Sequence, residues 1–199
     1  MNEFMKQKGV WIGVLLVLII FGIVYSRAQR KADTKIQDTV ATATTSVDTR
    51  VQGDSGLTLD VRNATYTIGA DTLAVVDGTV SSNVSGSSAT RKTTVLEGPA
   101  FADLTGDNVK DGVVLLRDEN GGSGTFYYVA AVLADGSSQK TTNSMLLGDR
   151  IRIKEISIDN SIISVTILER AEGESMVTAP SVAKTLRYTV DGQKLVSLQ

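Results

Sequence analysis

The segment Phe126-Tyr127-Tyr128-Val129-Ala130-Ala131-Val132-Leu133 contains no charged residue and is apolar or aromatic at every position. A strand of this composition would present apolar side chains on both faces, because successive side chains point to opposite sides. The segment 112–116, Gly-Val-Val-Leu-Leu, has the same character. Strands that are apolar on both faces are buried on both sides. We therefore expect these two segments to be central strands that other layers cover on both sides.

Other segments alternate between apolar and polar residues, which is typical of strands with one buried face. The alternating apolar positions are Leu57, Leu59 and Val61, then Ala64, Tyr66 and Ile68, and near the end of the chain Leu186, Tyr188 and Val190. The pairs Asp77-Gly78, Asp135-Gly136, Asp159-Asn160 and Asp191-Gly192 separate apolar runs. Such pairs favour tight hairpin turns, which need positive φ angles. The sequence therefore predicts an all-β, mostly antiparallel domain of about eight to ten strands, folded as a sandwich or a partly closed barrel.

One strand carries a change of phase. Ile151 and Ile153 would point to one face of a regular strand, and Ile156 and Ile158 to the other. A β-bulge, which inserts one extra residue, would bring all four side chains to the same face. We favour a bulge near Lys154 over the alternative, a strand that is buried on both sides.

Residues 9–25 form a run of seventeen uncharged residues, GVWIGVLLVLIIFGIVY, with lysines before it and basic residues after it. As a helix this run would reach about 25 Å, close to the thickness of a bilayer core. It is expected to be a single transmembrane helix that anchors the protein and leaves the C-terminal part outside the cytoplasm. A cleaved signal peptide is the alternative, because Ser26-Arg27-Ala28 places small residues where cleavage requires them.

The predicted organisation has four parts. Residues 1–8 are a short basic N-terminus, residues 9–25 the transmembrane helix or signal-anchor, residues 26–56 a flexible tether, and residues 57–199 an extracytoplasmic β domain. The tether is rich in Thr, Ser, Ala and Asp and has too few apolar residues to form a core.

The chain contains no histidine and no cysteine. This composition excludes Ser-His-Asp and Cys-His catalysis, the usual zinc sites, and haem or iron–sulfur ligation. From Leu57 onward there are 17 acidic and 13 basic residues, a net charge of −4. A surface of this charge does not favour nucleic acid as a partner. Catalysis would have to use carboxylates or a Ser-Lys pair, and no spacing marks either, so we predict that the protein is not an enzyme.

The segment 101–112, FADLTGDNVKDG, carries the most chemistry. Aligned with a calcium-binding loop that begins at residue 103, the segment fills the first, third, fifth, seventh and ninth positions with Asp103, Thr105, Asp107, Val109 and Asp111. A loop that winds around a hard cation presents alternate residues to it, with a backbone carbonyl at the seventh position. The twelfth position, usually a bidentate Glu, is Val114, which predicts weak calcium binding unless another segment supplies oxygen. Asp118 and Glu119 are the candidates for that oxygen. The alternative is a turn closed by its own Asp and Thr side chains.

The segment 101–116 resembles the calcium loop and following strand of FG-GAP and related cell-surface repeats, although it occurs once here. The longer stretch that includes LLRDENGGSGTFYYVAAVL resembles a family of uncharacterised bacterial envelope proteins. The resemblance implies an exported bacterial β domain with a calcium-loop-like turn, and it implies no activity. We therefore expect a membrane-anchored binding or accessory domain, stabilised by calcium, whose partner is an envelope protein or polymer. The alternative is a carboxylate-dependent hydrolase that acts on envelope polymers.

Overall fold

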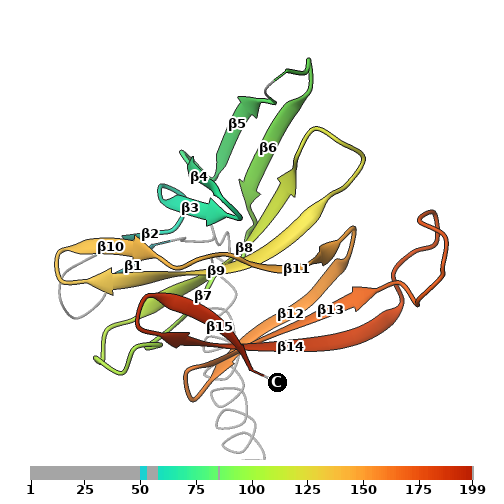
Figure 1. Ribbon diagram of the computed structural model, residues 1–199. Helices are drawn as coiled ribbons and strands as arrows, with labels where there is room; N and C mark the ends of the chain where they lie inside the picture. Colours follow the sequence, from blue (N-terminus) through green and yellow to red (C-terminus); the bar gives the residue numbers. More distant parts are fainter. Residues whose placement is uncertain (1–49, 53–57, 85, 199) are drawn as a thin grey trace, which may run out of the picture. The chain divides into compact units, whose positions relative to one another are not determined.

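A computed structural model describes residues 50–52, 58–84 and 86–198 (Figure 1). The chain divides into two compact units, residues 1–46 and 47–199, and every described residue belongs to the second. The predicted transmembrane helix at 9–25 and most of the predicted tether lie outside the described residues. Among the residues that are described, no helix has the length and apolar character needed to cross a membrane.

The described part of the chain is all-β, as the alternation predicts. Its strands are β1 (Arg50–Gln52), β2 (Thr58–Asp60), β3 (Thr65–Ile68), β4 (Asp71–Ala74), β5 (Thr79–Asn83), β6 (Thr90–Val95), β7 (Ala100–Ala102), β8 (Asp111–Glu119), β9 (Phe126–Asp135), β10 (Ser138–Thr141), β11 (Met145–Asp149), β12 (Arg152–Asp159), β13 (Ile162–Glu169), β14 (Val182–Asp191) and β15 (Lys194–Leu198). These strands pair with one another in antiparallel fashion. They outnumber the eight to ten expected, because several have only three to five residues.

The largest sheet has seven strands and curls like half of a barrel (Figure 1). Its order is β10-β9-β8-β6-β5, with β11 also paired to β9 and β7 to β8. A four-stranded sheet, β12-β13-β14-β15, and two hairpin-like pairs, β1-β2 and β3-β4, make up the rest.

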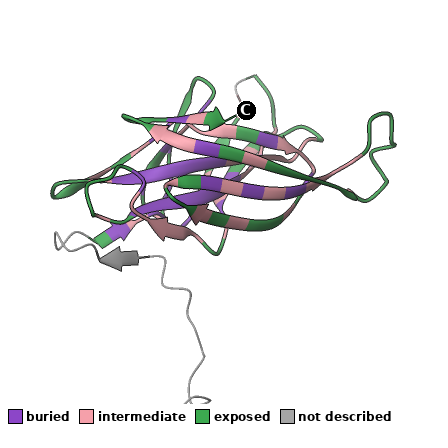
Figure 2. Ribbon diagram, turned by 90° about the horizontal axis from the view of Figure 1, so that it is seen from below, coloured by how far each residue is buried: buried purple, intermediate pink, exposed green. Residues whose placement is uncertain are grey.

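Strands β8 and β9 are covered on both faces, as predicted. Val113 and Leu115 of β8 belong to a hydrophobic cluster with the four-stranded sheet. Val114 and Leu116, which alternate with them, belong to a second cluster with β2, β3 and β4. The buried residues therefore run along the central strands, while the loops are exposed (Figure 2). The burial of each of these side chains contributes about 1.5–3 kcal/mol, so the two clusters on β8 and β9 hold the layers together.

The predicted bulge in β12 is confirmed. Ile153 pairs with Ile167 and Glu155 with Thr166, so Lys154 is the extra residue. Because of this insertion, the isoleucines on either side of Lys154 pack against the same hydrophobic cluster.

Tight turns occur at the predicted places or one residue later. Asp77 and Gly78 have φ angles of 51° and 82° between Val76 and Thr79. Between β12 and β13 the two turn residues are Asn160 and Ser161, with φ angles of 48° and 59°, one residue later than predicted.

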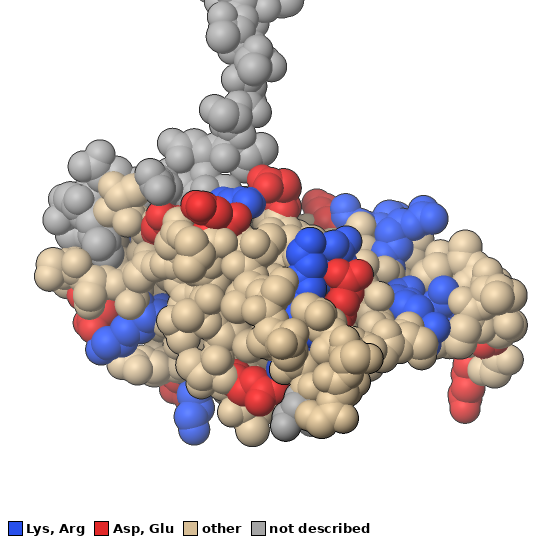
Figure 3. Space-filling view, turned by 90° about the horizontal axis from the view of Figure 1, so that it is seen from above, with Lys and Arg blue, Asp and Glu red and all other residues tan. Residues whose placement is uncertain are grey.

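Seen from above, charged side chains of both signs lie among larger areas of uncharged surface (Figure 3).

Candidate functional site

The predicted calcium loop lies between β7 and β8. The carboxylate of Asp103 accepts hydrogen bonds from the backbone N–H groups of Thr105 (3.2 Å), Gly106 (2.6 Å) and Asn108 (2.8 Å). These amide bonds, that of Gly106 foremost, lower the pKa of Asp103. Asn108 has a φ of 64°, so it adopts the left-handed conformation that asparagine tolerates. Asp103 therefore organises the loop through its backbone.

Asp107 and Asp111 also accept bonds from backbone amides. Asp107 accepts from the N–H of Val109 at 2.8 Å. Asp111 is fully buried and accepts from Leu104 at 3.0 Å and from Ala134 at 2.9 Å. Burial raises the pKa of Asp111, and the charges of Asp107 and Asp103 raise it further.

These hydrogen bonds are the ones expected if the segment is a turn closed by its own side chains, the alternative to a calcium site. In the described part of the chain, no group of three or more acidic side chains is arranged to hold a metal ion. The donor set of Asp103, Thr105, Asp107, Val109 and Asp111 is nevertheless all oxygen, which suits calcium. The carboxylates also act on one another electrostatically, and a divalent cation would relieve that repulsion. The calcium site stays a prediction.

Asp118 and Glu119 do not complete this loop, contrary to the expectation that they could. Asp118 lies seven positions after Asp111 along the extended strand β8, a distance of about 23 Å at 3.3 Å per residue. Asp118 instead belongs to a second polar group at the other end of β8.

That second group lies in an open cleft of about 930 Å³. The hairpin β3-β4 forms one side of the cleft, and β5, β6, β8, β9 and β11 contribute to the other. The lining includes Asp71, Arg91, Asp118, Tyr128 and Leu146. Five strands and a hairpin from separate parts of the sequence thus meet around one cavity.

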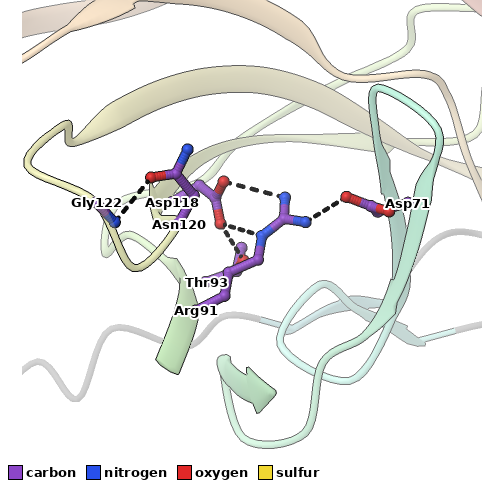
Figure 4. Close-up of polar contacts among 6 residues, drawn as sticks. All are labelled: Asp71, Arg91, Thr93, Asp118, Asn120 and Gly122. Carbon is purple, nitrogen blue, oxygen red and sulfur yellow. Dashed lines mark hydrogen bonds and ion pairs between the residues drawn. The ribbon is translucent and has the colours of Figure 1, made fainter. Parts of the chain in front are cut away.

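Arg91 and Asp118 form a two-bond ion pair inside the cleft (Figure 4). Nε of Arg91 donates to Oδ1 of Asp118 at 2.8 Å, and Nη2 donates to Oδ2 at 3.0 Å. Thr93 Oγ1 donates to Oδ1 of Asp118 at 2.7 Å. On the other side of the guanidinium, Nη1 donates to Asp71, which joins the hairpin to the large sheet.

The pairing register of β6 and β8 in the large sheet explains why the side chains of Arg91, Thr93 and Asp118 lie together. Thr93 of β6 pairs with Asp118 of β8, and Arg91 lies two residues before Thr93, so all three share one face. Asp118 is 2% exposed, whereas the side chain of Asp71 is 63% exposed. The hydrogen bond from Arg91 to Asp118 raises the pKa of the guanidinium, which therefore stays charged. Burial raises the pKa of the nearby Tyr128 hydroxyl, and the charge of Asp118 adds to this effect.

Sequence reasoning did not identify this cleft, although one signal was present. Asp118 continues the inward-facing series Val114 and Leu116 on β8. A carboxylate on a buried face needs a cation or several hydrogen-bond donors. That requirement predicts a partner such as Arg91, but it does not say which residue it is.

No protein-family model matches the chain, and no significant match was found among curated proteins or solved structures. The loop and the cleft are therefore interpreted from their own geometry.

Proposed function

We propose that the protein is a membrane-anchored binding domain of the bacterial envelope, held outside the cytoplasm, which binds an envelope protein or polymer in the cleft beside Arg91. The cleft carries this proposal. Its volume, about 930 Å³, lies within the range of ligand sites, and its lining combines apolar side chains with a few convergent polar groups. The ion pair between Arg91 and Asp118 holds those polar groups in a fixed arrangement.

Binding can be tested by sedimentation of the detergent-solubilised chain with isolated bacterial cell-wall fractions. Asp71→Arg should abolish retention on the fraction that holds the wild-type chain, because it places a long cationic side chain at the exposed mouth of the cleft. Asp135→Arg is the matched control, since Asp135 is also exposed but lies at the C-terminal end of β9, outside the cleft. Equal retention of the Asp71→Arg variant and the wild-type chain would contradict the proposal.

The membrane anchor is supported by the uncharged run at residues 9–25 and its basic flanks. The full chain should resist extraction by alkaline carbonate and keep its original N-terminus. Protease added outside intact spheroplasts should digest the β domain. A mature N-terminus at Gln29 would instead show cleavage after Ala28.

Stabilisation by calcium is supported by the oxygen donors of the loop at 103–111. A site with this few carboxylates should bind with a dissociation constant of about 10⁻⁴ to 10⁻³ M. A hundredfold excess over that constant would add about 2.7 kcal/mol to the free energy of unfolding. The melting temperature should therefore rise with calcium, and Asp107→Ala should remove most of the rise while Asp135→Ala keeps it. An unchanged melting temperature at this hundredfold excess, about 10 to 100 mM calcium, would leave the loop as a turn.

A hydrolase is the second candidate, because two carboxylates from different strands, Asp71 and Asp118, both line the cleft. Glycoside hydrolysis needs one carboxyl group as an acid and another as a base or nucleophile. Here both are bonded to the same guanidinium, and Asp118 accepts three hydrogen bonds. This arrangement favours binding over proton transfer. Release of reducing ends from purified cell-wall polymer, lost in Asp71→Asn, would favour the hydrolase.

A further inference from the structure

The mouth of the cleft places hydrogen-bond donors beside an acceptor. A guanidinium has five N–H groups, and three of those on Arg91 donate to Asp118 and Asp71. Two N–H groups, one on Nη1 and one on Nη2, have no partner among the described residues. Asp71 uses Oδ2 for Arg91, which leaves Oδ1 at an exposed position as an acceptor.

Next to this polar group lies an apolar surface. Tyr128 of β9 pairs with Leu146 of β11, so the two side chains are neighbours on one face of the sheet. Both line the cleft, and Leu146 is 54% exposed. The raised pKa of Tyr128 keeps its hydroxyl protonated, so this group is also a donor.

The charges of the cleft restrict its ligand. Asp71, Asp118 and Arg91 are the charged residues of the lining, and together they carry a net charge of −1. A polyanion would be repelled. A cationic group could bind Asp71, but an ammonium or guanidinium has no acceptor for the hydrogen bonds that Arg91 offers. A neutral ligand with adjacent hydroxyl groups can use both, because each hydroxyl donates one hydrogen bond and accepts others.

From this arrangement we propose that the cleft binds a neutral carbohydrate. Two adjacent hydroxyls of one sugar ring bond to the N–H groups of Arg91 and to Oδ1 of Asp71, and the C–H face of the ring or of its neighbour packs on Tyr128 and Leu146. The inference names the ligand of the cleft described above and thus rests on the proposal that this cleft is a binding site.

The test uses the full chain in a zwitterionic detergent, because glycoside detergents would compete for the site. Binding of cellotetraose and of fully N-acetylated chitotetraose, both neutral, is measured by calorimetry and by saturation-transfer NMR, beside tetralysine and inorganic polyphosphate. At least one of the two sugars should bind saturably. Asp71→Ala and Tyr128→Ala should each weaken it about tenfold, the effect of losing one hydrogen bond to a charged group or one packed aromatic side chain. The control Val177→Ala, at an exposed apolar residue outside the cleft, should leave it unchanged.

Thermal melting of each variant shows whether the protein is still folded, and Leu146→Ala, at an exposed position, supplies a second variant of the apolar surface. Failure of both sugars to bind overturns the carbohydrate proposal. If tetralysine then binds in a manner that requires Asp71, the cleft is still a binding site, with a cationic ligand. If Asp71→Arg also leaves retention on cell walls unchanged, the proposed function fails with it. Sugar binding that is insensitive to the Asp71, Tyr128 and Leu146 variants would place the ligand elsewhere and overturn the inference.

Discussion

The side-chain amide of Asn143 pairs with the backbone of Leu195 as a neighbouring strand would. Nδ2 of Asn143 donates to the carbonyl of Leu195 at 3.1 Å, and the N–H of Leu195 donates to Oδ1 at 2.9 Å. Leu195 belongs to β15, an edge strand of the four-stranded sheet. The backbone of Asn143 forms a bridge to Thr67 on the other side of the large sheet. One residue therefore joins the layers on both faces of the large sheet and also covers an exposed strand edge.

Asn143→Asp should destabilise the fold, because the carboxylate keeps the acceptor but loses the donor and faces the carbonyl of Leu195. The expected loss is about 1–3 kcal/mol in the free energy of unfolding, the cost of a buried polar group left without its partner. Urea denaturation measures it. Gln193→Glu, an equivalent change in the exposed turn between β14 and β15, should stay within about 0.5 kcal/mol. Equal effects of the two changes would show that the Asn143 pairing contributes nothing.

The bulge in β12 leads to a prediction about deletions. Removing Lys154 should leave a regular strand in which Ile153 and Ile156 still face the core, since Glu155 alone then separates them. Removing Ser157 should turn Ile158 away from the core, because a shift of one residue reverses the faces of a strand. That loss is worth about 1.5–3 kcal/mol.

Thermal melting of the two deletion variants checks this prediction. The variant without Lys154 should melt near the wild-type temperature, and the variant without Ser157 several degrees lower. The opposite order would mean that the bulge itself stabilises the fold.

The pair of Arg91 and Asp118 should be far more sensitive to mutation than an exposed pair. Asp118→Ala leaves a largely buried guanidinium with only Asp71, and a broken buried pair costs about 3–5 kcal/mol. Glu97→Ala, which removes the exposed partner of Arg62, should cost less than about 1 kcal/mol. The double change Arg91→Met with Asp118→Leu should recover most of the stability, since apolar side chains of similar size can replace a buried pair. Chemical denaturation measures all three. A double variant no more stable than Asp118→Ala would contradict this account.

Local patterns predicted the central strands well, because the alternation of apolar and polar residues along a strand indicates which of its faces is buried. The apolar runs that became β8 and β9, the turn at Asp77 and Gly78, and the bulge at Lys154 can all be read within about ten residues of sequence. The strands β6, β7 and β11 were among those not predicted, because their segments show no apolar period of their own, although they pair in the structure.

Contacts between distant residues could not be predicted in this way. Asn143 and Leu195 lie 52 residues apart, and Gln139, whose side-chain amide pairs with the backbone of Asp60, lies 79 residues from it. A side-chain amide that pairs with a backbone segment produces no periodic pattern in the sequence. The same holds for the cleft, where Arg91 and Asp118 meet only because β6 and β8 pair in one register. The acidic loop at residues 103–111 was found by the spacing of its carboxylates. That spacing does not show whether backbone amides or a bound ion interact with them.

The loop carboxylates Asp103 and Asp111 should respond to pH in opposite directions. Amide hydrogen bonds lower the pKa of Asp103 in the folded protein. Its contribution to stability is therefore present above the pKa of the unfolded chain and is lost as the pH falls through the lower folded value. Burial raises the pKa of Asp111, so its contribution is present below the unfolded value and is lost as the pH rises through the folded one. Urea denaturation of the wild-type chain, Asp103→Asn and Asp111→Asn, in buffer with chelator and between about pH 7 and pH 3, measures both effects. The advantage of the wild type over Asp103→Asn should shrink towards the acid end, and its advantage over Asp111→Asn should grow. Two differences that change in the same direction with pH would show that these amide bonds and this burial do not control the two carboxylates.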